Sequence, residues 1–244
     1  KNESKKPQLE GLNDAPYFWN ESIKAEQNAL QFYSYNEKQA KEYRELGFGA
    51  VLSHQEDGVI RGTSALISLI EEEERQLLLS NAAMQYSFYK GMSKQTYPSS
   101  LMGIIALIRQ VHYDAIAYQQ LENKSKLNLT LEKLNEYAEL PKVIEVDGYL
   151  SALRANRIGD EFNFKFIIKG KGDEYKRLNE IKATESSFII PVNFPKVYDV
   201  SDPYDAMRLP YRKMKEWELA DENLARLERM QIPFAITVAD LEEK

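Results

Sequence analysis

The sequence predicts an α/β protein whose second half consists of parallel βα units. After Pro141, apolar runs alternate with helical patterns, and roughly 20 to 45 residues separate one run from the next. The runs show no alternation of polar and apolar residues, which fits strands buried on both faces of a sheet. This periodicity alone permits either a doubly wound sheet or a barrel.

Strands and helices alternate along the second half of the chain. Strands are expected at 143–146, 164–168, 187–192 and 233–237, with helices at 149–162, 173–182 and, for the most part, 203–230.

The first half has a different pattern. A helix is predicted at 36–46, because Asn36 is a good capping residue and Gly47 stands where a helix would stop. The region 98–138 reads as helical, with Ser100 near its start and a break at 123–128. Short strands are expected at 49–53, 64–70 and 76–80, with the acidic run 71–74 as a solvated turn.

Composition excludes several classes of function. The 244 residues are 43% hydrophobic and 29% charged with a net charge of −6, so a large core is feasible and a nucleic-acid partner is not expected. The absence of cysteine excludes disulfides, cysteine zinc sites and thiol nucleophiles. No apolar run approaches the roughly 18 residues of a membrane span, so no membrane partner is expected.

Domain organisation is expected to be simple. Residues 1–16 are polar and contain Pro7, Gly11 and Pro16, which predicts a linker, and 17–244 are expected to form one domain. The chain starts without Met, at Lys1, and we therefore expect it to be a segment of a longer protein.

Several motifs carry a family resemblance. Residues 143–147 (VIEVD) followed by 152–162 (ALRANRIGDEF) resemble the imidazolonepropionase-like branch of the amidohydrolase superfamily, which are metal-dependent hydrolases of C–N bonds. Residues 166–176 (FIIKGKGDEYK), 217–237 and 47–52 (GFGAVL) resemble later and earlier parts of the same family. The resemblance implies an incomplete (β/α)8 TIM-barrel-like domain, with strand 1, a small β-sandwich and the last helix outside this segment.

A narrower resemblance concerns residues 47–63 and 97–103. These are similar to large secreted tandem amidohydrolases of Bacteroidetes-type bacteria, in which the first of two amidohydrolase regions is degenerate. The resemblance implies a periplasmic or secreted location, which the segment itself does not reveal. An incomplete barrel exposes unpaired strand edges, so we expect the remainder of the parent polypeptide or another copy of the chain as partner.

The resemblance also implies a metal site at the C-terminal ends of the strands. Family members hold divalent metal with histidines on strands 1, 5 and 6 and an Asp on strand 8, and the metal activates a water molecule. Here the strand 5 positions hold Glu145, Val146 and Asp147, and the strand 6 position holds Gly170. Asp240 stands one residue after the strand 8 position. No metal is therefore assigned, and the binding of a divalent metal, Zn or Mg, stays an open alternative.

Two interpretations of these strand ends stay open. Glu145, Asp147 and Asp240 could ligate a hard cation such as Mg²⁺ through oxygen. Alternatively, the acidic side chains pair with Lys169 or Lys171 across neighbouring strand ends, which would replace a zinc-type site by a charge network.

The two histidines are expected to differ. His54 follows a strand, where it could bind substrate or act as a base, and a hydrogen-bonded surface role is the simpler alternative. His112 lies within the predicted helix beside its apolar stripe and is expected to be structural. The run 169–172 precedes a predicted helix, so weak anion binding there is conceivable, although Walker spacing is absent.

Three functions follow as hypotheses. The first is a non-catalytic amidohydrolase-like scaffold with a degenerate metal site. The second is an active metal-dependent hydrolase with a carboxylate-rich site, whose candidate catalytic residues are His54, Glu145, Asp147, Lys169, Lys171 and Asp240. The third is a carbohydrate- or peptide-binding module, suggested by the aromatic share.

Overall fold

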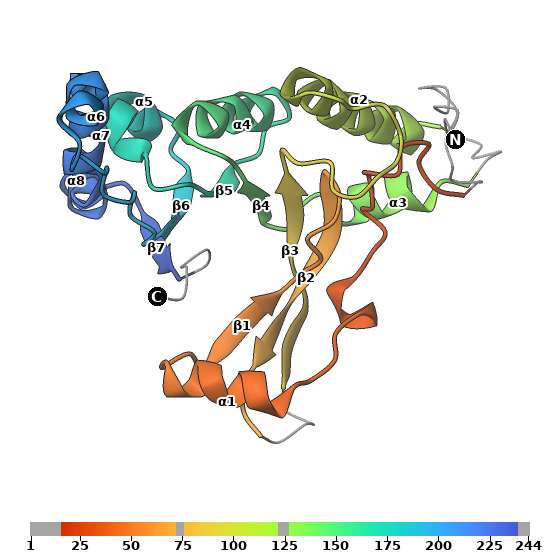
Figure 1. Ribbon diagram of the computed structural model, residues 1–244. Coiled ribbons are helices and arrows are strands. Elements are labelled where there is room, and N and C mark those ends of the chain that lie inside the picture. The colour runs from red at the N-terminus through yellow and green to blue at the C-terminus, as the bar shows by residue number, and fades with distance from the viewer. Residues whose placement is uncertain (1–15, 72–75, 122–126, 239–244) are drawn as a thin grey trace, which may run out of the picture. The chain divides into compact units, whose positions relative to one another are not determined.

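The computed structural model describes residues 16–71, 76–121 and 127–238, which form a mixed α/β fold (Figure 1). The chain divides into two compact units, residues 1–144 and 145–244. All but the last residue of the expected linker and most of the acidic run lie outside the described residues, as does Asp240. The expectation of a single domain over 17–244 stays a prediction.

The first unit is built on an antiparallel meander. Strand β1 (Ala50–Ser53) pairs with β2 (Ile60–Ser68), which pairs in turn with β3 (Leu77–Ser87). All three predicted strands exist, but β2 and β3 are longer than expected. A (β/α)8 repeat requires parallel neighbours, so this part of the chain departs from the regular barrel pattern.

The segment 17–32, which precedes the first helix and lies beside β2, has no hydrophobic periodicity, yet contacts with β2 fix its position. It runs parallel to β2 through the bridges Ile23↔Ile60 and Asn28↔Thr63, and ends in a short 3₁₀ helix, η1 (Ala29–Gln31). A small apolar cluster fixes it, since Ala29 packs with Ala65 and Ile67 of β2. This packing is tertiary, and local sequence patterns do not reveal it.

The helices of the first unit confirm the capping signals. Asn36 accepts a hydrogen bond from Gln39 N at 3.2 Å, and Ser100 accepts one from Gly103 N at 3.3 Å. The predicted break separates the second and third helices. The helices are α1 (Glu37–Glu45), α2 (Leu101–Gln119) and α3 (Leu129–Glu136).

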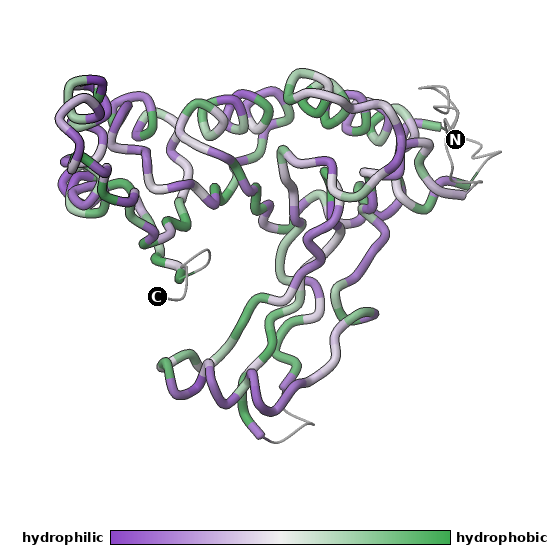
Figure 2. Tube along the Cα trace, viewed as in Figure 1, coloured by the Kyte–Doolittle hydropathy of each residue, from purple (hydrophilic) through white to green (hydrophobic). Residues whose placement is uncertain are grey.

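One face of α2 is buried. It includes an apolar stripe with spacings of three and four residues, formed by Ile104, Leu107, Ile108, Val111 and Ala115. Figure 2 shows hydrophobic residues along β1 and at the start of β3, where Leu78 is 55% exposed.

The second unit has the parallel βα order that the sequence predicts. Strand β4 (Lys142–Glu145) lies at the boundary and leads into α4 (Tyr149–Glu161). Strand β5 (Phe166–Lys169) pairs in parallel with β6 (Ser187–Pro191), which pairs in parallel with β7 (Phe234–Thr237). In Figure 1, α4 and α5 (Leu178–Ala183) lie along one side of β5 and β6.

Three helices occupy the helical region that was expected at 203–230. Pro203 stands in the first turn of one helix, and Pro210 precedes the next, since proline has no N–H to continue a helix. The resulting helices are α6 (Pro203–Arg208), α7 (Tyr211–Ala220) and α8 (Asn223–Arg229), and a 3₁₀ turn, η3 (Glu174–Arg177), precedes α5. Within the described part of the chain, no helix combines the length and apolar character needed to cross a bilayer.

Candidate functional site

The strand ends of the second unit hold an ion pair. Glu145 is the last residue of β4 and Lys169 the last of β5, and Val146 N donates to the Lys169 carbonyl at 3.0 Å. Lys169 Nζ lies 3.0 Å from Glu145 Oε1, with the two side chains 25% and 39% exposed. The predicted pairing of these two residues is therefore found in the structure, in a half-solvated setting.

Asp147 and Lys171 are both exposed. His54 lies in the first unit after β1, half-buried, with Nδ1 2.9 Å from the Gln55 carbonyl oxygen. A role of His54 or the strand-end residues in catalysis stays a prediction, and Asp240 lies outside the described residues.

Gly170 stands where the resemblance implies a metal-binding histidine, and a carboxylate fills the space beside it. A β-carbon built on Gly170 would lie 2.1 Å from Glu174 Oε1 and 3.4 Å from Ile190 Cδ1. Gly170 is not among the glycines with positive φ, so its backbone would accept other residues. Space, rather than backbone conformation, therefore requires glycine here.

Glu174 itself is fully buried, with 0% of its surface exposed. Its Oε1 accepts hydrogen bonds from the amides of Lys171 and Gly172 at 3.2 and 3.4 Å, and its Oε2 accepts one from Asn223 Nδ2 at 2.8 Å. Burial raises the pKa of Glu174, although these hydrogen bonds act in the opposite direction. The sequence suggested that an external anion could bind at 169–172. In the structure, the carboxylate of Glu174 accepts the hydrogen bonds from the amides there.

His112 is structural, as predicted. It is buried, and its Nε2 lies 3.3 Å from the Tyr86 hydroxyl, with the two rings stacked. Burial, with a smaller contribution from the charge of Lys142, lowers the pKa of His112 to about 4. The imidazole is therefore neutral at physiological pH.

The described strand-end donors do not fit the metal-ligand set that the resemblance implies. That set needs imidazoles, whereas here a carboxylate carries an ammonium partner and the strand 6 position has no side chain. Over residues 16–71, 76–121 and 127–238, no group of three or more His, Cys, Asp or Glu is placed to hold a metal ion.

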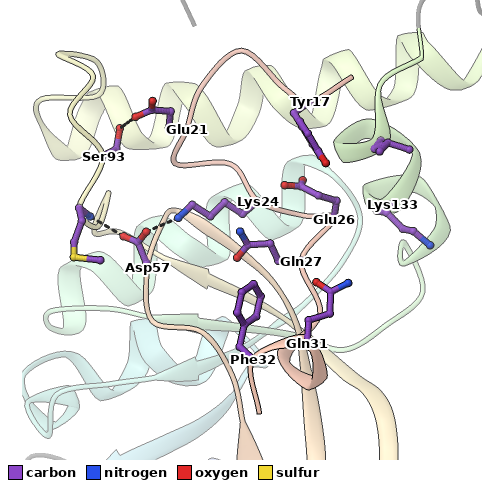
Figure 3. A pocket seen from close by; sticks show the side chains of 12 residues that line it. Tyr17, Glu21, Lys24, Glu26, Gln27, Gln31, Phe32, Asp57, Ser93 and Lys133 are labelled. Atoms are coloured by element: carbon purple, nitrogen blue, oxygen red, sulfur yellow. Dashed lines mark hydrogen bonds and ion pairs between the residues drawn. The ribbon is translucent and has the colours of Figure 1, made fainter. Parts of the chain in front are cut away.

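A separate cavity lies in the first unit. It has a volume of about 700 Å³, and the segment beside β2 supplies seven of its twelve lining residues (Figure 3). The lining residues are Tyr17, Glu21, Lys24, Glu26, Gln27, Gln31, Phe32, Asp57, Met92, Ser93, Leu129 and Lys133.

Backbone contacts hold that segment in place. Lys24 N donates to the Ile60 carbonyl at 2.8 Å, and Thr63 N donates to the Gln27 carbonyl at 2.9 Å. Gly62 makes this approach possible, because a β-carbon there would lie 2.1 Å from the Gln27 carbonyl oxygen. The cavity wall is therefore built by the fold and does not depend on a ligand.

An ion pair forms part of the cavity lining. Lys24 forms an ion pair with Asp57, and Asp57 Oδ1 accepts a hydrogen bond from Met92 N at 2.6 Å. A β-carbon on Gly91 would lie 1.9 Å from Asp57 Oδ1, so glycine is needed beside this carboxylate. Although burial acts to raise the pKa of Asp57, the hydrogen bonds from Lys24 and Met92 lower it overall.

Sequence reasoning missed both Glu174 and this cavity. The pair of glycines before Asp173 and Glu174 was a usable signal, because successive turn amides commonly receive a carboxylate. The cavity had no such signal, since its residues are spread over four stretches of the first unit and share no spacing.

Comparison with known proteins bears on the α/β fold alone. No protein-family model matches the chain, and no curated protein matches it. A solved structure that it resembles is the crystal structure of an amidohydrolase from Thermotoga maritima MSB8, with a TM-score of 0.65 at 17% sequence identity. The match covers 97% of this chain and 64% of that one, so the chain spans less than two thirds of its structural relative.

Proposed function

We propose that this chain is a non-catalytic, amidohydrolase-like domain that serves as a scaffold within a longer polypeptide. The observation that carries the proposal is what surrounds Gly170, the residue after β5 where the resemblance implies a metal-binding histidine. A carboxylate held by two amides and Asn223 lies where a side chain on Gly170 would extend. The ion pair of Glu145 with Lys169 supports it, because an ammonium group competes with any cation for that carboxylate.

The proposed setting follows the resemblance in the sequence. The domain would be the degenerate first region of a secreted tandem protein, and the remainder of that protein, or a second copy of the chain, would complete the partial barrel. The coverage of 64% of the related amidohydrolase supports a barrel that is incomplete within this segment.

Metal analysis tests the proposal directly. The protein is incubated with excess Zn²⁺ or Mn²⁺, freed of loose metal by gel filtration, and analysed by mass spectrometry for metal content. We expect metal far below stoichiometric amounts, together with no release of amine above the blank from a panel of N-acyl amino acids and cyclic amides. Stoichiometric, tightly bound zinc would end the proposal.

The active-hydrolase alternative makes the opposite prediction about one residue. If Glu145 ligates a catalytic metal, Glu145→Ala abolishes turnover of an amide substrate, whereas Glu180→Ala, at an exposed glutamate of α5, leaves turnover intact. Measured hydrolysis that depends on Glu145 in this way would replace the scaffold by an enzyme.

A further inference from the structure

The cationic groups around the first-unit cavity are already paired. Lys24 forms its ion pair with Asp57, as Figure 3 shows, and Lys133 Nζ lies 2.7 Å from Glu136 Oε2. An anionic ligand would therefore have to compete with an existing carboxylate at each lysine, which lowers the gain from its charge.

The acidic groups are engaged as well, but in a different way. Glu21 accepts a hydrogen bond from Ser93 Oγ at 3.1 Å, and Glu26 accepts one from Thr130 Oγ1 at 2.6 Å. Each carboxylate thus already has a hydroxyl as its partner and has further lone pairs to offer. The carboxylates in this part of the cavity wall therefore accept hydrogen bonds from hydroxyl groups.

The remaining lining groups are neutral and available. Among the described residues, the side-chain amides of Gln27 and Gln31 have no hydrogen-bond partner, and each amide offers both donors and an acceptor. Two aromatic side chains line the same cavity with much of their surface accessible, since Tyr17 is 45% and Phe32 is 55% exposed.

We propose that this cavity binds a short neutral oligosaccharide. A sugar presents hydroxyls that both donate and accept, which suits the glutamine amides and the carboxylates, and apolar C–H faces, which suit the aromatic rings. The volume of about 700 Å³ lies within the range of about 300–1,000 Å³ that is usual for ligand pockets. The rigid placement of the wall against β2 lowers the ordering cost of binding.

A peptide fits the cavity less well. Extended peptides are commonly recognised by the free edge of a strand, through backbone hydrogen bonds. Here the backbone of the wall is engaged with β2, at Lys24 N and at the Gln27 carbonyl, so side chains supply the recognition. Side-chain amides and aromatic faces favour the saccharide.

This proposal uses residues of the first unit only. The sugar site and the strand ends of the second unit share no residue, so binding in the cavity can be tested independently of catalysis at the strand ends. A protein that binds zinc at those strand ends could still bind a sugar in this cavity, and the reverse also holds.

Titration calorimetry tests it on the full chain. The probes are cellohexaose, maltohexaose, xylohexaose and mannohexaose, with a pool of neutral hexapeptides and inorganic phosphate as competing chemistries. We expect at least one oligosaccharide to bind with Kd between about 10 µM and 1 mM. The Kd should change less than about twofold between 50 and 500 mM NaCl, because the ligand is uncharged.

Two lining side chains provide the variants, the exposed Phe32 and the half-buried Gln27. Phe32→Ala removes an aromatic stacking face, and Gln27→Ala removes a side-chain amide that donates and accepts hydrogen bonds. Each variant should weaken binding about tenfold or more. The matched controls are Phe194→Ala, at a phenylalanine 52% exposed in the second unit, and Gln39→Ala, on the exposed face of α1, which should leave Kd unchanged. Unfolding midpoints confirm that all four variants fold.

Several results would overturn the proposal. These are the absence of binding by all four oligosaccharides up to 5 mM, binding that Phe32→Ala and Phe194→Ala weaken equally, binding of hexapeptides alone, and binding of phosphate that high salt abolishes.

Discussion

Oε1 of Glu174 lies 2.1 Å from the point where a β-carbon on Gly170 would stand, so the carboxylate occupies the space of the missing side chain. The two residues depend on each other. Gly170 leaves the space that the Glu174 carboxylate occupies, and Glu174 accepts hydrogen bonds from the amides of Lys171 and Gly172. A histidine at position 170 and a buried carboxylate at position 174 cannot both be accommodated in this turn.

The first prediction concerns this mutual dependence. Gly170→Ala should destabilise the protein by about 2–3 kcal/mol, because the methyl group must displace a buried carboxylate from its hydrogen bonds. Urea denaturation measures the loss. Gly49→Ala is the control, since its β-carbon would meet nothing within 4 Å and should cost little.

A double-mutant cycle sharpens the test. In a Glu174→Ala background the obstruction is gone, so Gly170→Ala should cost at least about 1 kcal/mol less than it does in the wild type. Additive effects would mean that the two residues do not compete for the same space.

The second prediction concerns pH. Burial raises the pKa of Glu174 above its usual 4.5, so the folded chain retains a proton that the unfolded chain releases. The folded state therefore binds more protons, and the free energy of unfolding falls as pH rises from about 4.5 through the raised pKa. The glutamine in Glu174→Gln cannot titrate. The free energy of unfolding of the wild type minus that of the variant, measured by urea titration, should therefore decline as pH rises over this window. A flat difference from pH 4 to 8 would contradict the raised pKa.

The regular part of the fold could be predicted from the sequence, and the reason is local. Asn36 and Ser100 cap helices within three residues of themselves, and the apolar runs of β5 and β6 indicated strands of a parallel sheet. The sequence left two interpretations of the acidic strand ends open, and the structure shows the pairing of Glu145 with Lys169.

The rest depended on contacts between distant residues. The segment beside β2 has no period of its own, and its position comes from Gln27 approaching a glycine 35 positions later, at Gly62. Likewise, nothing near Glu174 in the sequence indicates that Asn223 donates to it. The antiparallel pairing of β1 with β2 was missed because the resemblance suggested a parallel barrel strand at 47–52.

The third prediction concerns His112, whose buried ring has a pKa lowered to about 4. A folded pKa below the unfolded value of 6.5 gives stability that is present above pH 6.5 and is lost as pH falls toward 4. The loss should be on the order of 2–3 kcal/mol. His112→Gln retains hydrogen-bonding groups for Tyr86 without titrating, so the stability advantage of the wild type should shrink across this window.

Proton NMR checks the same group independently. The chain has two histidines, so His54→Gln leaves a single imidazole signal to follow. That signal should remain at its neutral position down to about pH 5. A midpoint near 6.5 would show that the ring is hydrated in the folded protein.

The last prediction concerns the ion pair at the strand ends. Because Lys169 and Glu145 are 25% and 39% exposed, water screens much of their attraction. The coupling energy from Glu145→Ala, Lys169→Ala and the double variant should be about 0.2–1 kcal/mol in urea titrations, and it should decrease in 1 M NaCl. A coupling above about 3 kcal/mol, unaffected by salt, would indicate a desolvated site of the kind that holds catalytic groups. In that case the strand ends would have to be reconsidered as an active centre.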